Sequence, residues 1–312
     1  MFFSEMLYGI ISVIIKEFVQ TWYSKITPDH VFVNEVIQVI AHCTRALEQR
    51  LRKVDLEGLM LDEIPGLLEE HLIAFRLAKQ QASSPQSLVS DPRLIYHTLY
   101  PHPALAPVPA DAVPSTYVEQ RENESAWRQL IIQGVLAVLL PTDDLNNGCL
   151  RSLVAEIFAE MILGNGISGK ACEGWLLWEA IGRIADILQT DHVQEKDPSS
   201  DDGAADEELS RLERFGLLPS QAEIPTGEET KEIKRRCAAS LLGLLPPKMA
   251  VAFFASDSKV VQHQQVEEIL ECLEDTYLNK HLVFQILELI VLRLAPELEQ
   301  QGIRDLMEER TG

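Results

Sequence analysis

Histidine and cysteine are the residues of this chain with the most versatile chemistry, because both types ligate metals and act in catalysis. His42 adjoins Cys43, and His71 follows Glu69 and Glu70, but neither histidine has a second ligand one helical turn away. No two of the five cysteines have the CxxC spacing of zinc or redox sites. We therefore predict no metal site, and cysteines scattered in this way are typical of buried thiols in the reducing cytoplasm.

Asp143 and Asp144 are neighbouring carboxylates of the kind that general acid–base catalysis uses. They follow Pro141, where carboxylates more often cap a helix N-terminus. The chain has no GxSxG nucleophile elbow, and Gly164-Asn165-Gly166 lacks the Lys-Ser/Thr pair of a phosphate-binding loop. We predict no catalytic residue, no enzyme activity and no cofactor. An enzyme acting on lipids through a dispersed site stays open as an alternative.

Two other polar groups favour a structural interpretation. For His281, a hydrogen bond at the start of a helix is a simpler role than catalysis. A compact basic cluster at residues 231–236 could touch lipid headgroups. Its side chains have Glu228, Glu229 and Glu232 at helical spacing, so pairing on a solvated helix face is the favoured account. The cluster consists of Lys231, Lys234, Arg235 and Arg236.

The formal charge of −21 excludes some classes of partner. Binding to nucleic acid depends on Lys and Arg that neutralise phosphates, so we predict no nucleic-acid partner. Adsorption of the whole surface to an anionic membrane is disfavoured for the same reason. A hydrophobic fraction of 46% nevertheless predicts a folded core. Contact with a membrane surface must therefore be local or mediated by another protein.

The segment Met1–Val19 is very apolar but does not have the features of a membrane span or a signal peptide. Glu5, Lys16 and Glu17 interrupt it, and crossing a bilayer takes about 20 apolar residues. No basic stretch precedes the apolar run. We predict a helix that is buried nearly all round in a protein core.

Apolar residues recur at helical spacing through most of the chain. In Leu150–Ile162 they follow an i, i+3, i+4, i+7 pattern, and the glycines after residue 163 predict the end of that helix. Alternation typical of strands is nearly absent, so we predict an all-α, multi-helix bundle. The other predicted helices are Val33–Val54, Leu56–Gln81, Glu124–Leu140, a stripe from Leu177 to Leu188, Lys231–Leu245, Gln265–Leu278 and Lys280–Ala295.

Two segments interrupt the helical pattern. Tyr100–Pro114 contains five prolines, which predicts an extended crossing loop. Asp191–Ser210 contains eight acidic residues and one lysine, which predicts a flexible linker. We therefore divide the chain into a helical domain of residues 1–190, an acidic linker of residues 191–230 and a helical domain of residues 231–312.

Short segments in the first domain resemble successive landmarks of the PXA domain. The proline-rich stretch Leu99–Leu105 is similar to the "HPAL" loop of that domain, and Leu139–Pro141 with Leu150–Ile157 is similar to its last helices. The order of these segments carries the resemblance, which covers residues 8–188. The remaining landmarks are Trp22–Ile26, Asn34–Val36, Val54–Leu56 and His71.

The second domain resembles the C-terminal domain of sorting nexins, known as PXC or nexin C. Leu278–Leu282, Leu287–Leu289 and Leu294–Leu298 are similar to the end of that domain, although Ala295 replaces the usual aromatic residue. PXA-containing sorting nexins usually also carry RGS-like and PX domains. The linker is far shorter than a domain of about 100 residues. We therefore expect either a short family member that lacks PX and RGS domains or a longer protein from which such segments have been removed, and we infer no phosphoinositide binding.

The resemblance implies that the PXA and PXC halves pack as one helical assembly around an apolar cavity. It implies binding of a fatty acid or phospholipid, with transfer as an extension of binding, at organelle contacts, in a cytoplasmic protein peripheral to endoplasmic reticulum or endosomal membranes. Ordinary core packing is the plainer role for the same side chains. A non-enzymatic scaffold that binds a partner protein's helix in an apolar groove is the alternative. The residues proposed to line the cavity are Phe18, Trp22, Leu136, Leu139, Phe158, Met161, Trp175, Trp178, Phe253, Phe284 and Leu287.

Overall fold

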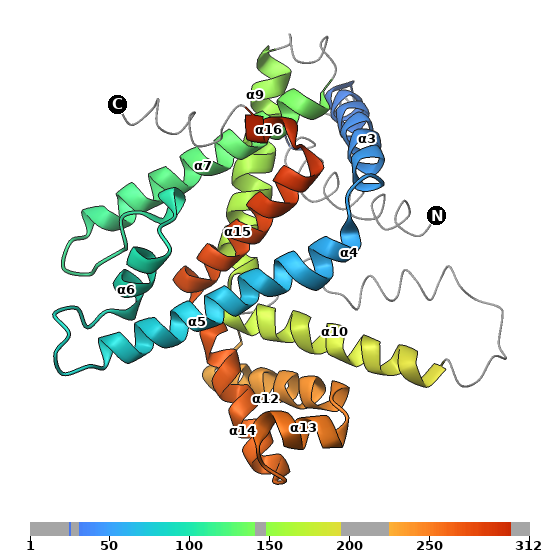
Figure 1. Cartoon of the computed structure of the whole chain (residues 1–312). Coiled ribbons are helices and arrows are strands. Elements are labelled where there is room, and N and C mark those ends of the chain that lie inside the picture. The colour runs from blue at the N-terminus through green and yellow to red at the C-terminus, as the bar shows by residue number, and fades with distance from the viewer. Residues whose placement is uncertain (1–24, 26–30, 141–147, 195–224, 301–312) are drawn as a thin grey trace. The chain divides into compact units, whose positions relative to one another are not determined.

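The computed structural model describes residue 25 and residues 31–140, 148–194 and 225–300 of the 312-residue chain (Figure 1). In these residues the regular elements are helical, and the extended pairing is limited to one isolated bridge between Ala110 and Val113. The predicted all-α fold is therefore confirmed. The predictions for Met1–Val19 and for Asp143 and Asp144 fall outside the described residues.

The helices form two compact units. Unit 1 combines Met1–Lys170 with Lys280–Gly312, and unit 2 is Ala171–Asn279. The C-terminal segment therefore packs with the first part of the chain, whereas residues 231–279 belong to unit 2 with residues 171–190. A joint assembly of PXA and PXC halves stays a prediction. The domain limits at residues 190 and 230 stay a prediction, because residues 195–224 are not described.

In the first described part of unit 1, the helix α3 is followed by α4, η2 and α5, and these last three elements follow one another without a break. Asp55 caps the short helix α4, because its Oδ1 accepts a hydrogen bond from the Gly58 N–H at 3.0 Å. The chain then passes through the π-helical turn η2 directly into α5. Asp91 caps the next helix, α6, in the same manner. The bounds are α3 Val31–Leu51, α4 Leu56–Gly58, η2 Leu59–Glu63, α5 Ile64–Ala82 and α6 Pro92–Leu99.

The proline-rich stretch forms the predicted extended loop. Its one helical turn is the 3₁₀ element η3, Pro103–Leu105, where the His102 side chain accepts a hydrogen bond from the Ala104 N–H. The long helix α7, Ser115–Leu139, follows the loop and begins nine residues earlier than predicted. η3 packs against α7.

The predicted helix end at Gly164-Asn165-Gly166 is wrong. The helix α9, Gly148–Glu156, continues as the π-helix η4, Ile157–Ala171, through all of these glycines. A Cβ on Gly164 would lie 3.2 Å from Arg128 Nε, so the missing side chain lets this arginine lie directly against the helix. Glycine here serves close packing instead of helix termination.

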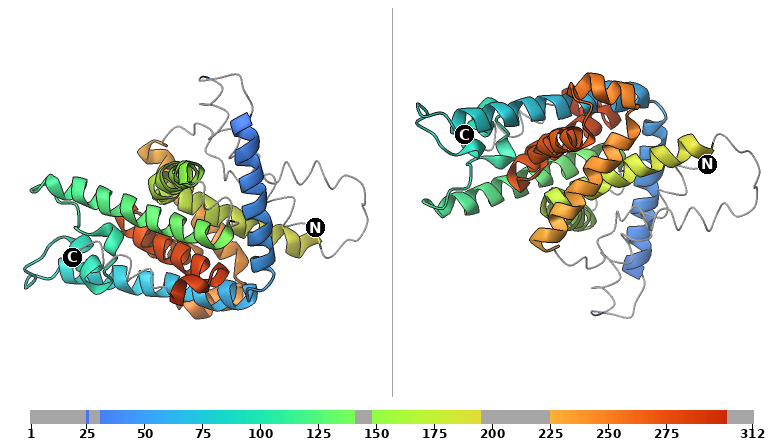
Figure 2. Two further views of the ribbon diagram at one scale, coloured as in Figure 1. Left: turned by 90° about the horizontal axis from the view of Figure 1, so that it is seen from above. Right: turned by 90° about the horizontal axis from the view of Figure 1, so that it is seen from below.

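The helix α15, Thr276–Leu294, contributes its residues from Lys280 onward to unit 1, followed by α16, Glu297–Gln300. Both views of Figure 2 show α15 between α5 and α7. An apolar core lies beside it, with Leu287 packed against the buried side chains of α7, α9 and η4. The buried members of that core are Ile132, Leu136, Leu140, Val154, Ala155, Ala159 and Leu163.

Unit 2 is built on the pair α10 and α12, which lie side by side (Figures 1 and 2). Gly182 permits a close approach, because a Cβ there would lie 3.4 Å from the Cα of Cys237. Thr226 and Glu229 form a capping box at the start of α12. The bounds are α10 Gly174–Gln194, α12 Gly227–Leu244, α13 Pro247–Phe254, α14 Lys259–Leu270 and η5 Glu271–Leu273.

Candidate functional site

A pocket of about 440 Å³ lies in unit 1, at the ends of helices that are far apart in the sequence. The end of α3 and the residues just after it form one side, Val138 of α7 contributes to the wall, and the end of α15 and the start of α16 complete it. The described lining residues are Ala46, Gln49, Arg50, Lys53, Val54, Val138, Arg293, Leu294, Pro296 and Glu297.

The charged lining of this pocket is predominantly basic. Three cations, Arg50, Lys53 and Arg293, and one carboxylate, Glu297, give the described lining a net charge of +2 in a chain of −21. Arg50 is fixed by hydrogen bonds to the Leu294 carbonyl at 3.0 Å and to Glu297 Oε2 at 2.9 Å. The hydrogen bond from Arg50 lowers the pKa of Glu297 below its ordinary value, so this carboxylate is charged at neutral pH.

The rest of the lining is mainly apolar, because alanine, valine, leucine and proline side chains from three elements face the same space. An apolar wall beside two arginines and a lysine matches the chemistry of an amphiphile with an anionic head. Arg50 already pairs with Glu297, and Arg293 with Glu63. Lys53 is therefore the lining cation with which the carboxylate of a fatty acid or the phosphate of a phospholipid would pair. Its hydrocarbon would cover the apolar wall.

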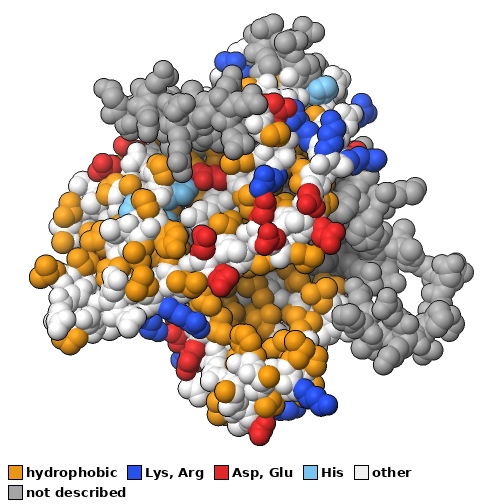
Figure 3. All heavy atoms as spheres, in the orientation of Figure 1, with side chains coloured by type: hydrophobic (Ala, Val, Ile, Leu, Met, Phe, Trp, Pro, Cys, Tyr) orange, Lys and Arg blue, Asp and Glu red, His pale blue; other side chains and the backbone are white. Residues whose placement is uncertain are grey.

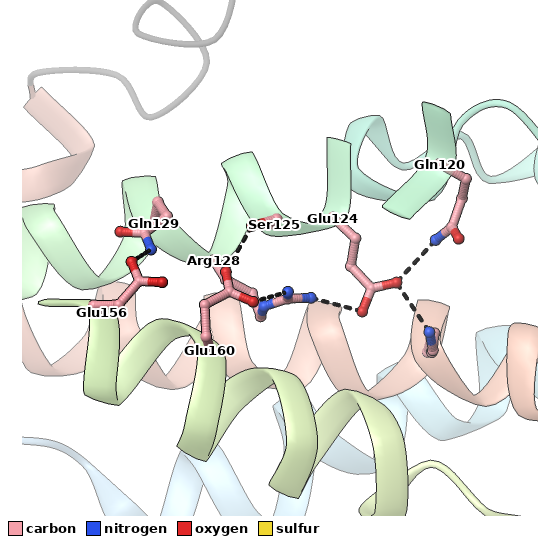
Figure 4. Close-up of polar contacts among 8 residues, drawn as sticks. Gln120, Glu124, Ser125, Arg128, Gln129, Glu156 and Glu160 are labelled. Atoms are coloured by element: carbon pink, nitrogen blue, oxygen red, sulfur yellow. Dashed lines mark hydrogen bonds and ion pairs between the residues drawn. The ribbon is translucent and has the colours of Figure 1, made fainter. Parts of the chain in front are cut away.

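A second polar arrangement, buried in the interior of unit 1, is the charge cluster of Figure 4. Arg128 of α7 donates to Glu124 Oε1 at 2.8 Å and to Glu160 Oε2 at 2.7 Å. Lys280 of α15 donates to Glu124 Oε2 at 2.9 Å. The cluster therefore ties α7 to η4 and to α15 through ion pairs, and both Glu124 and Arg128 are buried.

The carboxylates of this charge cluster are held in the charged state. Burial alone would raise the pKa of Glu124, but the charge of Lys280 and hydrogen bonds from Lys280 and Gln120 lower it below the ordinary value. Burial also acts to raise the pKa of Glu160, and hydrogen bonds from Ser125 and Arg128 outweigh it. Both carboxylates are therefore paired within the cluster, as buried charges require, whereas Arg128 Nε has no hydrogen-bond partner among the described residues.

Ser125 and Glu160 are the arrangement closest to a nucleophile and its base, with Ser125 Oγ donating to Glu160 Oε1 at 2.6 Å. Because the pKa of Glu160 is lowered and Arg128 also pairs with it, Glu160 is a poor proton acceptor. We therefore assign this pair a structural role.

Histidines and aromatic rings form a third cluster, again where α15 meets the first part of the chain. His71 Nδ1 lies 2.7 Å from the Tyr96 hydroxyl, and His97 Nδ1 lies 3.3 Å from His281 Nε2. Burial, together with His97, His102 and His71, lowers the pKa of His281 to about 2. His281 is therefore a neutral packing residue on the second turn of α15, not at the start of the helix as predicted.

The same cluster continues with Trp127 of α7 and Phe284 of α15, whose rings stack with centroids 4.2 Å apart. Trp127 Nε1 donates to Glu288 Oε1 at 2.8 Å, and His102 Nε2 lies 3.4 Å from that same oxygen. His102, the histidine of the "HPAL" loop, thus lies in the packing interface of the loop with α7 and α15. Among the described residues, no group of three or more His, Cys, Asp and Glu could hold a metal ion.

The predicted lipid-lining residues do not lie together in the structure. Leu136, Phe158 and Leu287 come together in the apolar core of unit 1, and Phe284 is buried on Trp127. In the same unit Leu139 is buried and Met161 is half-buried. In unit 2, Trp175 is half-buried, Trp178 is buried with its Nε1 donating to the Leu270 carbonyl, and Phe253 is exposed. Phe18 and Trp22 lie outside the described residues.

None of the predicted residues is among the described residues that line the 440 Å³ pocket. The basic run Arg50-Leu51-Arg52-Lys53 was the available signal, because it is unusual in so acidic a chain. Two residues of the basic cluster of α12 pair as predicted, Lys231 with Glu228 at 2.8 Å and Arg235 with Glu232 at 3.8 Å, whereas Lys234 lies 3.9 Å from Glu274 instead.

Comparison with known proteins identifies the first part of the chain. A family model described as the PXA domain matches residues 3–184. "PXA domain protein 1" of Schizosaccharomyces pombe (strain 972 / ATCC 24843) is 35% identical over 138 residues, which cover 44% of this chain and 25% of that protein. The match thus spans about a quarter of the length of this relative. No solved structure matches the chain.

Proposed function

This chain belongs to the family of PXA-domain proteins, and from that premise we propose that it binds a fatty acid or a phospholipid at a membrane. Membership of the family suggests a membrane-associated role. The proposal adds a ligand, a lipid with an anionic head, and a place for it, the amphipathic pocket of unit 1. It also includes a non-enzymatic mode of action, and a peripheral location on the cytoplasmic face of endoplasmic reticulum or endosomal membranes.

The observation that carries the proposal is the charge of the pocket. Arg50, Lys53 and Arg293 gather around an apolar wall in a chain with 48 acidic and 27 basic residues. The volume of about 440 Å³ lies within the range of about 300–1,000 Å³ typical of small-molecule sites. Each methylene of an acyl chain that leaves water contributes about 0.8 kcal/mol to binding. Transfer of the lipid between membranes at organelle contacts would follow from reversible binding.

The affinity of variants for labelled palmitate tests whether the pocket is the lipid-binding site. Lys53→Glu reverses a charge in the lining, and we expect it to weaken binding about tenfold because an anionic head then faces a carboxylate. Arg52→Glu is the matched control, since Arg52 pairs with Glu48 on the surface and does not line the pocket. Equal affinity of both variants for palmitate would refute the assignment of the site.

A second candidate function is a scaffold that binds a partner protein's helix. Leu61 and Leu68 favour it, since both are large exposed apolar residues seven positions apart on η2 and α5. Leu61→Ser together with Leu68→Ser should then abolish capture of the partner while leaving palmitate binding unchanged. The two functions are therefore separable by variants at different surfaces.

A further inference from the structure

The turn between α13 and α14 in unit 2 exposes large apolar side chains. Phe253 is 74% exposed, Val260 is 77% exposed, Met249 is 59% exposed and Val261 is 40% exposed. We call these four residues the apolar tip. Figure 3 shows hydrophobic side chains at the surface where α13 and α14 lie. Large apolar side chains exposed on two consecutive helices favour an interaction site at this part of a soluble protein.

Residues next to the apolar tip are buried or hydrogen-bonded within unit 2. Met249 and Phe253 are four residues apart and therefore lie on one face of α13. Ala250 and Phe254 follow these residues by one position each and are buried on an adjacent face of the same helix. Ala255, with φ of 50°, turns the chain into α14, and the Gln262 side chain closes this turn by donating to the Ser256 carbonyl at 2.6 Å.

The charge around the apolar tip differs from that of the chain as a whole. Residues 246–262 contain two lysines, Lys248 and Lys259, and one acidic residue, Asp257. Both lysines are exposed, and neither forms an ion pair with another residue that the structure describes. The cations of α12, in contrast, include Lys231, Lys234 and Arg235, all paired with glutamates.

In the part of the chain that the structure describes, no single helix is long and apolar enough to cross a membrane. Together α12 and α13 meet the test of length and composition, but they are bent by 114° relative to each other. Cys237, Ala238 and Phe254 of this pair are buried within the protein. A shallow insertion by the exposed end therefore fits this geometry, with the paired part of α12 remaining in water.

We propose that the apolar tip inserts into the boundary between headgroups and acyl chains of a phospholipid bilayer that contains anionic lipids. Lys248 and Lys259 then lie at the level of the lipid phosphates, and Met249, Phe253 and Val260 enter the apolar layer. The chemistry favours a bilayer because aliphatic and aromatic side chains flanked by lysines are the pattern of interfacial anchors. This inference does not depend on the pocket of unit 1.

Co-sedimentation of the full chain with vesicles tests the inference. The wild-type chain should bind vesicles of phosphatidylcholine and phosphatidylserine more tightly than vesicles of phosphatidylcholine alone. Phe253→Ser with Val260→Ser should weaken binding about tenfold or more, because both side chains lose apolar burial. Leu88→Ser is the matched control, since Leu88 is a fully exposed apolar residue of unit 1.

Two more variants separate this surface from the rest of the molecule. Lys248→Glu with Lys259→Glu should remove the preference for phosphatidylserine, and Arg52→Glu, which reverses a surface charge of unit 1, should leave vesicle binding unchanged. A Phe253→Trp chain should show added quenching by brominated lipids, a signal that needs no loss of stability. Failure of the wild-type chain to bind vesicles, or binding that Phe253→Ser with Val260→Ser does not alter, overturns the inference. Absence of the added quenching also overturns it.

Discussion

The two units satisfy their buried polar groups by different means. Unit 1 buries the ion pair of Glu124 and Arg128 and completes it with Lys280 from a distant part of the chain. Unit 2 buries Asn279 and Trp178, neutral side chains that donate to backbone carbonyl oxygens. Its ion pairs are at least partly exposed to solvent.

The difference indicates what each kind of contact contributes. Burying an ion pair gives little net stability, because desolvation offsets the attraction, but removing one partner is severely destabilising. We infer that the charge cluster specifies which helix packs against α7, since Lys280 is 156 residues away from Glu124 in the sequence. Neutral donors to carbonyl oxygens suffice in unit 2, which is one continuous segment of the chain.

The largest effect should come from separating the two parts of unit 1. A chain ending at Asn279 loses Lys280, His281 and Phe284, so α7 would expose Trp127 and leave Glu124 with one ion pair fewer. We expect this chain to aggregate or to bind a dye such as ANS as a molten state. A chain ending at Gln300 keeps all described contacts and should melt cooperatively. A cooperatively melting chain ending at Asn279 would contradict the joint assembly.

Replacing one arginine in each unit compares the stability that a buried ion pair and a half-exposed ion pair contribute. Arg128→Met leaves Glu124 and Glu160 without their shared partner in a buried site, and we expect a loss of about 3–5 kcal/mol in the free energy of unfolding. Arg183→Met removes the half-exposed pair with Glu179 in unit 2 and should cost less than about 1 kcal/mol. Urea denaturation of both variants measures the two losses. Similar values would show that the charge cluster has no special role.

A smaller effect concerns the dependence of stability on pH. The pKa of His281 is about 2 in the folded protein, against 6.5 when unperturbed, so below pH 6.5 the unfolded chain takes up a proton that the folded chain does not. Stability is therefore lost as the pH falls below 6.5, by up to about 1.4 kcal/mol per pH unit. The lowered pKa of His97 acts in the same direction. The lowered pKa of Glu124 adds a further loss only below its ordinary value of 4.5.

Thermal melts between pH 7 and pH 5 test the role of His281. The stability of His281→Leu should fall less steeply over this range than that of the wild-type chain, whatever its absolute stability. The exposed His42 provides the control, and His42→Gln should retain the wild-type slope. An unchanged slope in His281→Leu would assign the acid sensitivity to other groups.

Much of the fold could be predicted because it depends on local patterns. Apolar spacing predicted α3 and α12 to within a few residues, and the prolines of residues 100–114 predicted the loop before α7. The first turns of α7 were missed because they are polar and lack an apolar stripe, although Gln120 and Glu124 are buried there in the charge cluster. Local sequence cannot show that such residues find partners elsewhere in the chain.

The pocket was missed for a related reason. Its cations Arg50 and Arg293 are 243 residues apart, and only the packing of α15 brings them to one space. Aromatic residues were the basis of the predicted lining, and Trp178 and Phe284 instead belong to the interiors of the two units. Large apolar residues fill cores more often than they line cavities.

Native mass spectrometry of the full chain, followed by extraction and identification of bound lipid, tests lipid binding most directly. We predict one fatty acid or phospholipid per chain in the wild type and in Arg52→Glu, and markedly less in Lys53→Glu. Wild-type protein that is free of lipid after purification from several expression hosts would contradict the proposed lipid binding. It would then favour the scaffold function and a search for a protein partner.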